Sequence, residues 1–193
     1  MENIRVFTKE SGVTTLGPGQ RYCLWVQGCR QRCPGCITPQ SRDEQGGSLI
    51  PVSALAAEIA LSGMDGLTIS GGEPFLQAAA LAELIDRIRR RRDMGVIVYT
   101  GLVYEQLLEQ PQARSLLDRT DLLIDGPYLQ ALDDGRSLRG SSNQRTICLT
   151  ERYRQDLDLY GREGRTRQII PHGAYDNIVG IPNTQKPKGE RQE

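Results

Sequence analysis

Residues 21–36 read RYCLWVQGCRQRCPGC, an apolar and aromatic run that leads directly into three closely spaced cysteines. Aromatic and β-branched side chains are abundant in residues 21–27, which favours a buried strand. The strand is expected to stop at Gly28, and a cysteine-rich loop over residues 28–41 follows it. This stretch therefore predicts a strand that carries a group of thiols at its carboxyl end.

The rest of the chain alternates short apolar runs with amphipathic segments. The predicted strands lie at 3–8, 66–70, 95–99, 121–125 and 145–150, and the predicted helices at 51–62, 75–92 and 103–119, the last one divided at Pro111. Strands that alternate with helices indicate parallel strands joined by right-handed crossovers. We expect an α/β fold of about five to six parallel strands, short of a closed eight-stranded barrel.

Chemically versatile side chains follow several of these strands. Cys29 follows the strand at 21–27, residues 71–73 (Gly-Gly-Glu) follow the next one, and Thr100 and Asp125 stand at the ends of two more. Parallel strands that belong to βα units present their functional loops at the carboxyl ends. The sequence therefore predicts one shared site at this edge of the sheet.

Cys29, Cys33 and Cys36 bring three thiols together in a short loop. Thiolates are soft ligands that select iron–sulfur clusters or zinc. A 4Fe–4S cluster usually takes four cysteines, so three of them would leave one iron open to a substrate or cofactor.

A structural zinc site is the alternative interpretation of these thiols. Such a site needs four protein ligands, normally as two spaced pairs. The remaining candidates, Cys23, Cys148 and His172, form no second pair, and both cysteines fall inside predicted strands where buried core thiols are expected. An iron–sulfur cluster is therefore favoured.

Length and charge limit the remaining possibilities. The chain has 193 residues with 24 basic and 24 acidic side chains, which fits one domain at residues 1–180 followed by a polar tail, 181–193, that we expect to be disordered. The zero net charge gives no support for a nucleic-acid partner. Because no apolar run reaches the roughly 20 residues of a membrane span and the start resembles no signal peptide, we expect a cytoplasmic protein without a membrane partner.

The spacing Cys-x-x-x-Cys-x-x-Cys after a strand resembles the signature of the radical S-adenosylmethionine superfamily. Residues 71–74, Gly-Gly-Glu-Pro, are similar to its glycine-rich segment. The resemblance implies a partial (βα) barrel, an incomplete TIM barrel. It also implies a 4Fe–4S cluster held by the three cysteines, whose open iron binds S-adenosylmethionine. Gly71, Gly72 and Glu73 would contact the methionine amino group.

Further stretches resemble the activating enzymes of glycyl-radical enzymes, in particular those of anaerobic ribonucleotide reductase. They are residues 17–29, 98–101, 121–127 and 138–145, the last reading LRGSSNQR. The resemblance covers about residues 15–147. It implies an enzyme that cleaves S-adenosylmethionine to a 5′-deoxyadenosyl radical and takes a hydrogen atom from a glycine of the reductase, with electrons from a flavodoxin- or ferredoxin-type reductant.

Two alternatives remain beside this activity. The chain departs from those enzymes at Leu16, Ile37 and Thr38, which leaves room for a radical enzyme that acts on a different small molecule or peptide. The other alternative is an iron–sulfur electron carrier, but residues 71–74 and 138–145 speak against it because a carrier needs no cofactor pocket.

The resemblance also suggests roles for single side chains. Thr100 and Asp125 would bind the cofactor or a cation, or else cap the ends of their strands. The guanidinium of Arg139 matches the carboxylate of the cofactor. The motifs contain no evident general base, and removal of a hydrogen atom requires none.

Overall fold

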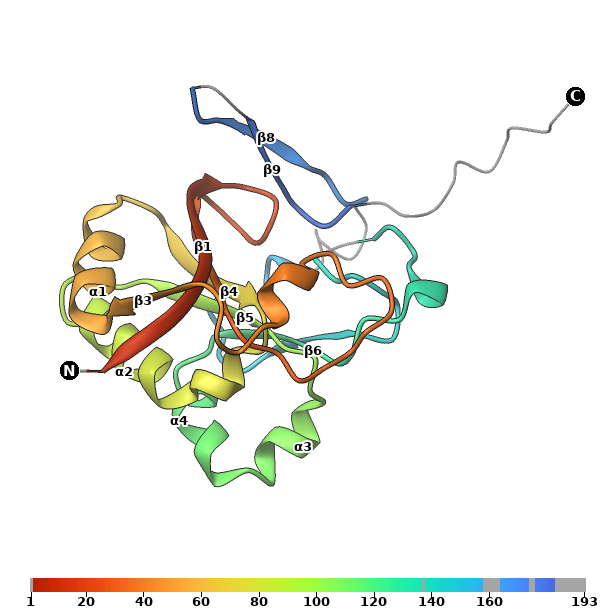
Figure 1. Ribbon diagram of the computed structural model, residues 1–193, viewed down its shortest axis with the longest axis horizontal. Coiled ribbons are helices and arrows are strands. Elements are labelled where there is room, and N and C mark those ends of the chain that lie inside the picture. Colours follow the sequence, from red (N-terminus) through yellow and green to blue (C-terminus); the bar gives the residue numbers. More distant parts are fainter. Residues whose placement is uncertain (1, 137, 158–163, 174–175, 183–193) are drawn as a thin grey trace, which may run out of the picture.

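A seven-stranded mixed sheet forms the centre of the molecule (Figure 1). The computed structural model describes residues 2–136, 138–157, 164–173 and 176–182. Most of the tail predicted at 181–193 lies outside these described residues. The strand order is β3-β1-β2-β4-β5-β6-β7. The strands are β1 (Asn3–Val13), β2 (Arg21–Val26), β3 (Ser48–Pro51), β4 (Gly66–Gly71), β5 (Gly95–Tyr99), β6 (Leu122–Asp125) and β7 (Arg145–Cys148).

Four neighbouring strands of the described sheet, β2, β4, β5 and β6, run parallel. The prediction of about five to six parallel strands is therefore wrong. Segments 3–8 and 145–150 do form strands, but β1 and β7 run antiparallel to their neighbours β2 and β6. Parallel neighbours need a long crossover, usually a helix. Residues 14–20 are too short for one, and the described part of 126–144 contains only the 3-10 helix η4 (Gln130–Leu132).

The helices pack on one face of the sheet (Figure 1). They are α1 (Val52–Leu61), α2 (Ala78–Arg89), α3 (Tyr104–Leu108) and α4 (Arg114–Leu117), with the 3-10 helices η2 (Pro74–Gln77) and η3 (Pro111–Ala113). A further 3-10 helix, η1 (Pro39–Arg42), belongs to the cysteine loop. Alternate strand residues such as Leu24 and Val26 join the helices of this face in the main apolar core, as the period of two in a strand requires. Pro111 divides the helix predicted at 103–119, as expected. Within the described ranges, no helix has both the length and the apolar character that a membrane span requires.

The opposite face of the sheet carries a buried cation, Arg21, whose exposed fraction is 0%. Its guanidinium donates hydrogen bonds to the Thr68 hydroxyl (3.0 Å), the Leu67 carbonyl (2.7 Å) and the Tyr153 hydroxyl (2.6 Å). Gly66 leaves room for this group, because a Cβ there would lie 2.0 Å from Nη1. The buried cation therefore ties strands together at their amino-terminal ends, away from the predicted site.

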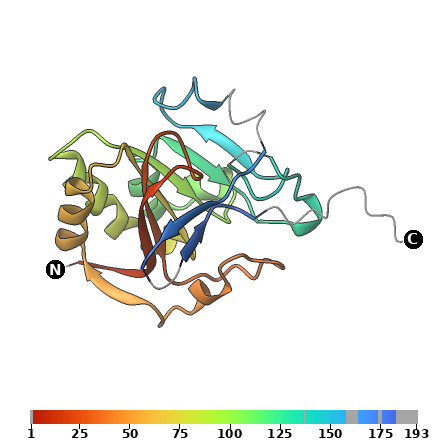
Figure 2. The same cartoon turned by 90° about the horizontal axis from the view of Figure 1, so that it is seen from above.

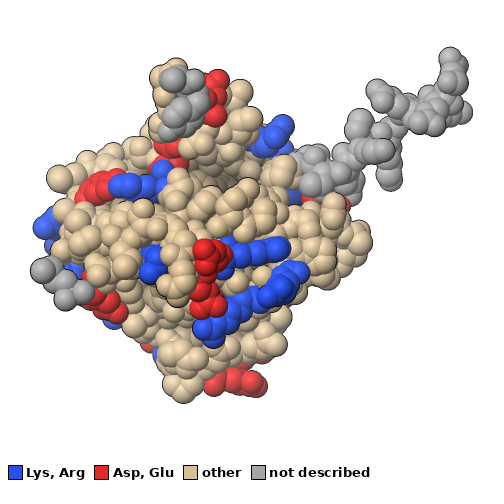
Figure 3. Space-filling view, in the orientation of Figure 1, with Lys and Arg blue, Asp and Glu red and all other residues tan. Residues whose placement is uncertain are grey.

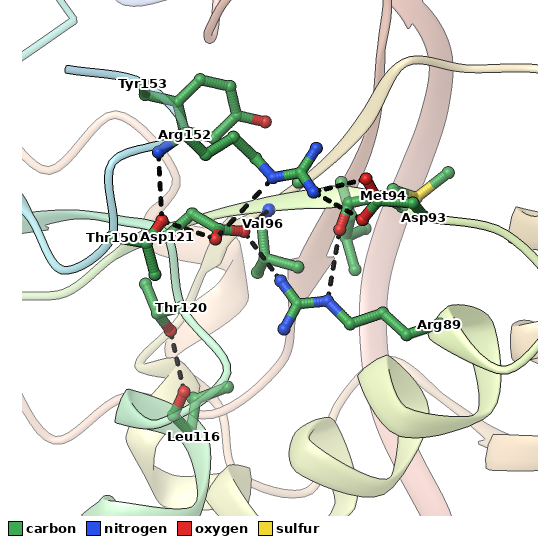
Figure 4. A network of polar contacts seen from close by, with 12 residues as sticks. Arg89, Asp93, Met94, Val96, Leu116, Thr120, Asp121, Thr150, Arg152 and Tyr153 are labelled. Carbon is green, nitrogen blue, oxygen red and sulfur yellow. Dashed lines mark hydrogen bonds and ion pairs between the residues drawn. The ribbon is translucent and has the colours of Figure 1, made fainter.

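A buried carboxylate performs a similar task nearby (Figure 4). Asp121 precedes β6 and accepts hydrogen bonds from the Val96 N–H (2.8 Å), the Arg89 guanidinium (2.7 Å) and the Thr150 hydroxyl (2.8 Å). Because Arg89 ends α2 and Val96 belongs to β5, this one side chain fixes the helical layer, two strands and the chain after β7.

Two strands that the sequence analysis did not predict form a separate antiparallel pair, here named the C-terminal ribbon. It crosses over β1 on the side away from the helices (Figure 2). The Gln168 carboxamide accepts from the Thr14 N–H (2.8 Å) and donates to the Gly12 carbonyl (2.9 Å), and Val179 packs against Cys23. The ribbon is thus docked on the sheet. Its strands are β8 (Gln168–Pro171) and β9 (Asp176–Val179).

Tyr153→Phe removes the hydroxyl that accepts the shortest hydrogen bond of Arg21. Losing a hydrogen bond to a charged group costs about 1.5–3 kcal/mol, so we expect the free energy of unfolding to fall by that amount in urea titrations of the anaerobically reconstituted protein. Tyr104→Phe is the matched control, since the hydroxyl of this half-buried tyrosine bonds to no described residue. Equal losses in both variants would contradict the role given to Tyr153.

Candidate functional site

A cavity of about 480 Å³ opens at the carboxyl ends of the parallel strands. The cysteine loop, the ends of β4 and β5, the chain after β6 and the C-terminal ribbon all contribute to its wall. Small-molecule sites in proteins typically have volumes of about 300–1,000 Å³. The structure therefore brings the loops of separate strands around one space large enough for a cofactor.

The cysteine loop is closed at its base and faces this cavity. The Gly28 N–H donates to the Ser41 carbonyl (2.8 Å), and the Arg42 guanidinium donates to the Cys33 carbonyl (2.7 Å). These two bonds join the ends of the segment 28–41 and hold its middle. Its three half-buried, free thiols all line the cavity: Cys29, Cys33 and Cys36.

The electrostatic surroundings of Cys29 suit a positively charged metal group. Burial raises the pKa of the Cys29 thiol above its usual value, and a hydrogen bond with the backbone of Gln31 offsets only part of this effect. Negative charge from Glu73, Cys33 and Cys36 raises that pKa further. A thiol is deprotonated when it ligates a metal, and bound iron would supply the positive charge that this group of side chains lacks.

The arrangement of the thiols fits a cluster better than a single ion. Among the described residues, no three His, Cys, Asp or Glu side chains are placed to hold one metal ion. A 4Fe–4S cluster does not require such convergence, because each thiolate binds a different iron. Three cysteines on one cavity wall are thus suited to hold a 4Fe–4S cluster.

Gly71 and Gly72 allow two backbone segments to touch. A Cβ on Gly72 would lie 2.2 Å from the carbonyl oxygen of Gly28, and a Cβ on Gly71 would lie 2.5 Å from the backbone of Val26. Hydrogen bonds cross this contact from the Gly72 N–H to the Val26 carbonyl (2.7 Å) and from the Glu73 N–H to the Gly28 carbonyl (2.8 Å). The resemblance implies that these glycines contact the methionine amino group, and the structure shows in addition that they lie against the end of β2 and the start of the cysteine loop.

Glu73 is buried in the wall of the cavity, with 4% of its surface exposed. Its carboxylate accepts hydrogen bonds from the Phe75 N–H (3.1 Å), the Thr100 hydroxyl (2.8 Å) and the Gly101 N–H (2.9 Å). Burial raises the pKa of Glu73, and these three bonds offset only part of the rise. Because a carboxylate offers about four acceptor sites, one site remains for a donor inside the cavity.

Two predicted site residues, Asp125 and Arg139, do not appear among the described residues that line the cavity. Asp125 is 1% exposed, accepts from the Tyr104 N–H (2.7 Å) and forms an ion pair with Arg145. Arg139 is paired with Asp134 at 2.7 Å. Asp125 therefore acts as a cap at the end of its strand, and the guanidinium of Arg139 is already engaged.

The other potential metal ligands also lie apart from the site. Cys23 is buried in β2, where burial raises its pKa to about 12, and Cys148 is half-buried in β7. His172 Nε2 lies 2.6 Å from a carboxylate oxygen of Glu10. Cys23, Cys148 and His172 are not among the described residues of the cavity wall, where three cysteines stand together.

The LRGSSNQR segment shapes the cavity through the backbone. The Gln144 carboxamide accepts from the Gly140 N–H (2.8 Å) and donates to the Gly126 carbonyl (2.8 Å), while the Asn143 amide donates to the Pro127 carbonyl (2.8 Å). These bonds hold the chain after β6 against residues 138–145. Gly126, Gly140 and Gln144 all line the cavity.

Several cavity residues were not singled out from the sequence. Asp133 follows β6 and forms a buried ion pair with Arg165, whose side chain is 2% exposed. Arg167 and Asn177 come from the C-terminal ribbon and its approach. No motif and no regular spacing of apolar residues marks the segments that carry these side chains. Only their long-range contacts in the folded chain show that they belong to the site.

Comparison with known proteins agrees with this geometry. The profile of the 4Fe-4S single cluster domain family matches residues 15–147. The chain belongs to this family, and its similarity to activating proteins of 30% and 32% identity places it among the radical S-adenosylmethionine activating enzymes. It is thus an enzyme whose cofactors are a 4Fe–4S cluster and S-adenosylmethionine.

Several curated relatives of this family member are activating proteins. The anaerobic ribonucleoside-triphosphate reductase-activating protein of Enterobacteria phage T4 is 30% identical over 141 residues, which cover 70% of this chain and 88% of the relative. The protein of the same name from Vibrio cholerae is 32% identical, covering 66% and 87%. The pyruvate formate-lyase 1-activating enzyme of Escherichia coli is 29% identical, covering 74% of this chain and 59% of that enzyme.

Gly72→Ala tests the backbone contact that holds the cysteine loop. The added methyl group would overlap the Gly28 carbonyl, so the cysteine loop must shift. The protein should therefore bind less iron and sulfide after anaerobic reconstitution. Such overpacking typically costs about 1–3 kcal/mol of stability. Gly164→Ala is the control, because its Cβ would meet nothing nearer than 3.9 Å. Full iron content and unchanged unfolding in Gly72→Ala would refute this role of the contact.

Proposed function

We propose that the chain activates a glycyl-radical enzyme, an anaerobic ribonucleotide reductase, by removing a hydrogen atom from one of its glycines. One observation carries the proposal: three free cysteines and residues 71–73 line a single cavity at the ends of parallel strands. The relatives named as activating proteins support it. When bound and reduced, the cluster and S-adenosylmethionine supply a 5′-deoxyadenosyl radical.

The chain itself holds and orients these groups. Cys29, Cys33 and Cys36 would hold the cluster, and the open acceptor site of Glu73 would receive the ammonium group of the methionine moiety. The hydroxyl of Thr100 keeps that carboxylate in place through its 2.8 Å hydrogen bond. These residues fit the cofactor because an acceptor and three thiols face the same cavity.

Apolar side chains restrict water in the same space. Leu16 and Trp25 line the cavity, and Leu16 is only 6% exposed. Exclusion of water protects reactive intermediates from side reactions. We infer that this part of the wall keeps the hydrogen atom transfer directed at the substrate.

Asp125 and Arg139 act at a distance from the cavity in this proposal. Asp125 and Arg145 hold the end of β6 beside α3, and Arg139 with Asp134 holds the loop that leads to Gly140. We therefore assign them as positioning residues.

The proposal includes further expectations on architecture and surroundings. The four parallel strands with helices on one face would form an incomplete barrel whose open side admits the partner. A flavodoxin- or ferredoxin-type protein would reduce the cluster. A cytoplasmic location would keep the five cysteines reduced.

Cys33→Ala and Cys148→Ala separate cluster ligands from core thiols. After anaerobic reconstitution with dithionite and S-adenosylmethionine, Cys33→Ala should lose the iron absorbance and release no 5′-deoxyadenosine. Cys148→Ala should keep both, because its thiol lies in β7 outside the cavity. Cleavage that survives in Cys33→Ala, or that disappears in Cys148→Ala, would overturn the ligand assignment.

The partner is tested by mixing the reduced protein, S-adenosylmethionine and the anaerobic ribonucleotide reductase of the same organism. We expect the doublet of a glycyl radical in the EPR spectrum, and none when the cofactor is omitted. Release of 5′-deoxyadenosine without any glycyl radical would favour the second candidate, a radical enzyme with another substrate.

A further inference from the structure

We propose that the C-terminal ribbon is the substrate-recognition wall of this site and that Arg167 binds an acidic side chain of the substrate polypeptide. This role rests on the proposed function and adds the chemistry that the site recognises. The ribbon lies beyond residue 147, where the match to the family profile ends. A part of the chain outside the matched domain therefore contributes to the same cavity as the cysteines.

The ribbon is held in a fixed position on β1. Glu10, which is 7% exposed, accepts a hydrogen bond from the Asn177 amide (2.9 Å) and lies 2.6 Å from His172 Nε2 through the same oxygen. Burial alone would raise the pKa of Glu10, but the hydrogen bonds from Asn177 and His172 outweigh it and hold that pKa below its usual value. Together with Gln168, which bonds to Thr14 (2.8 Å), these contacts anchor both strands.

The chain turns from the ribbon into the cavity at Gly180. Its φ angle is 121°, and a Cβ there would lie 2.6 Å from the Thr166 carbonyl oxygen. Glycine thus permits residues 180–182 to line the cavity beside Val179 and Arg167. The end of β9 and the residues that follow it therefore form part of the cavity wall.

Arg167 is the one cationic side chain among the described residues that line this cavity. It is exposed, and no hydrogen bond or ion pair to another described residue engages its guanidinium. The acidic side chains of the cavity have other partners: Asp133 forms an ion pair with Arg165, and Glu73 accepts hydrogen bonds from three donors. An unpaired guanidinium here favours an anionic ligand, and carboxylates are matched by its planar fork.

The surface charge makes this cation more distinctive. Basic and acidic side chains lie close together across the visible face in Figure 3. On this face the charges form no broad field of one sign, so a partner can be selected by a single charge at the right place.

The outer face of the ribbon indicates a polypeptide ligand. Ile169 and Ile178 stand opposite each other in the register of the two strands and are 63% and 59% exposed. Ile178 also lines the cavity. The two isoleucines therefore form an apolar surface that continues from the outer face of the ribbon to the opening of the cavity. The cavity of about 480 Å³ also has to hold the cofactor. A ligand that reaches both Arg167 and the isoleucines must therefore come from outside, as a chain segment with an acidic side chain beside an apolar one.

The experiment compares Arg167→Gln and Arg167→Lys with Arg114→Gln in the full, anaerobically reconstituted protein. Arg114 is the control, since it is an exposed arginine at the start of α4, away from the cavity, and is paired with Asp118 just after that helix. Three quantities are measured: the Kd for the anaerobic ribonucleotide reductase of the same organism, the glycyl radical formed with it, and the 5′-deoxyadenosine released without it. The Kd is also measured with protein that lacks cluster and cofactor.

We expect Arg167→Gln to raise the Kd for the reductase by about tenfold, with or without cluster and cofactor, because one charge-assisted hydrogen bond is lost. Raising the salt concentration should reduce the difference in Kd between the wild type and Arg167→Gln, because salt screens a charge contact made by an exposed side chain. Arg167→Lys should lie between the wild type and Arg167→Gln, and Arg114→Gln should match the wild type. Release of 5′-deoxyadenosine in the absence of the reductase should stay unchanged in all variants.

Three results would overturn this assignment. One is an unchanged Kd in Arg167→Gln, and another is an equal fall in cofactor cleavage and partner activation, which would place Arg167 on the cofactor. The third is a wild-type protein that binds no reductase, which would point to a small anionic substrate. If the wild type binds the reductase through Arg167 but releases no 5′-deoxyadenosine, the proposed function fails and the recognition role stands.

Discussion

The contact between the end of β4 and the start of the cysteine loop is the constraint on which the site depends. Gly72 lies so close to Gly28 that no side chain fits between them, and the Glu73 N–H donates across the contact at 2.8 Å. The same Glu73 then binds Thr100 and Gly101 after β5 through its carboxylate. Three consecutive parallel strands therefore share one frame at their carboxyl ends. The thiols and the acceptor for the cofactor cannot move independently, which is the rigidity that a positioned reaction needs.

The opposite end of the sheet is devoted to stability. Arg21 and Asp121 are buried there, and each joins strands that are distant in sequence. Buried polar groups of this kind are costly unless every partner is present, so they fix one arrangement of the strands. Polar networks at the amino-terminal ends leave the carboxyl ends open to loops and ligands, the division of labour known from barrels of parallel strands.

Local sequence was enough to predict the parts of the site that are short and consecutive. The strand before Gly28, the cysteine loop at 28–41 and the glycines at 71–72 are each marked by composition and spacing within a few residues. Strand direction was not predictable in the same way, because β7 resembles its parallel neighbours in composition and only the missing helix before it reverses its course. Arg139 was a reasonable partner for a carboxylate, but the ion pair with Asp134 engages it, and only the fold brings those two side chains together.

The ribbon shows how recognition and chemistry can be separated within a small domain. Cofactor binding draws on motifs inside residues 15–147, the segment matched by the family profile. Arg167, Ile178 and the chain at 180–182 come from outside that segment and reach the same cavity. Removal of a hydrogen atom requires no general base, so selectivity must come from where the substrate is held. A wall that is anchored on β1 through Glu10 and not on the cysteine loop can vary with the substrate while the frame around Gly72 stays the same.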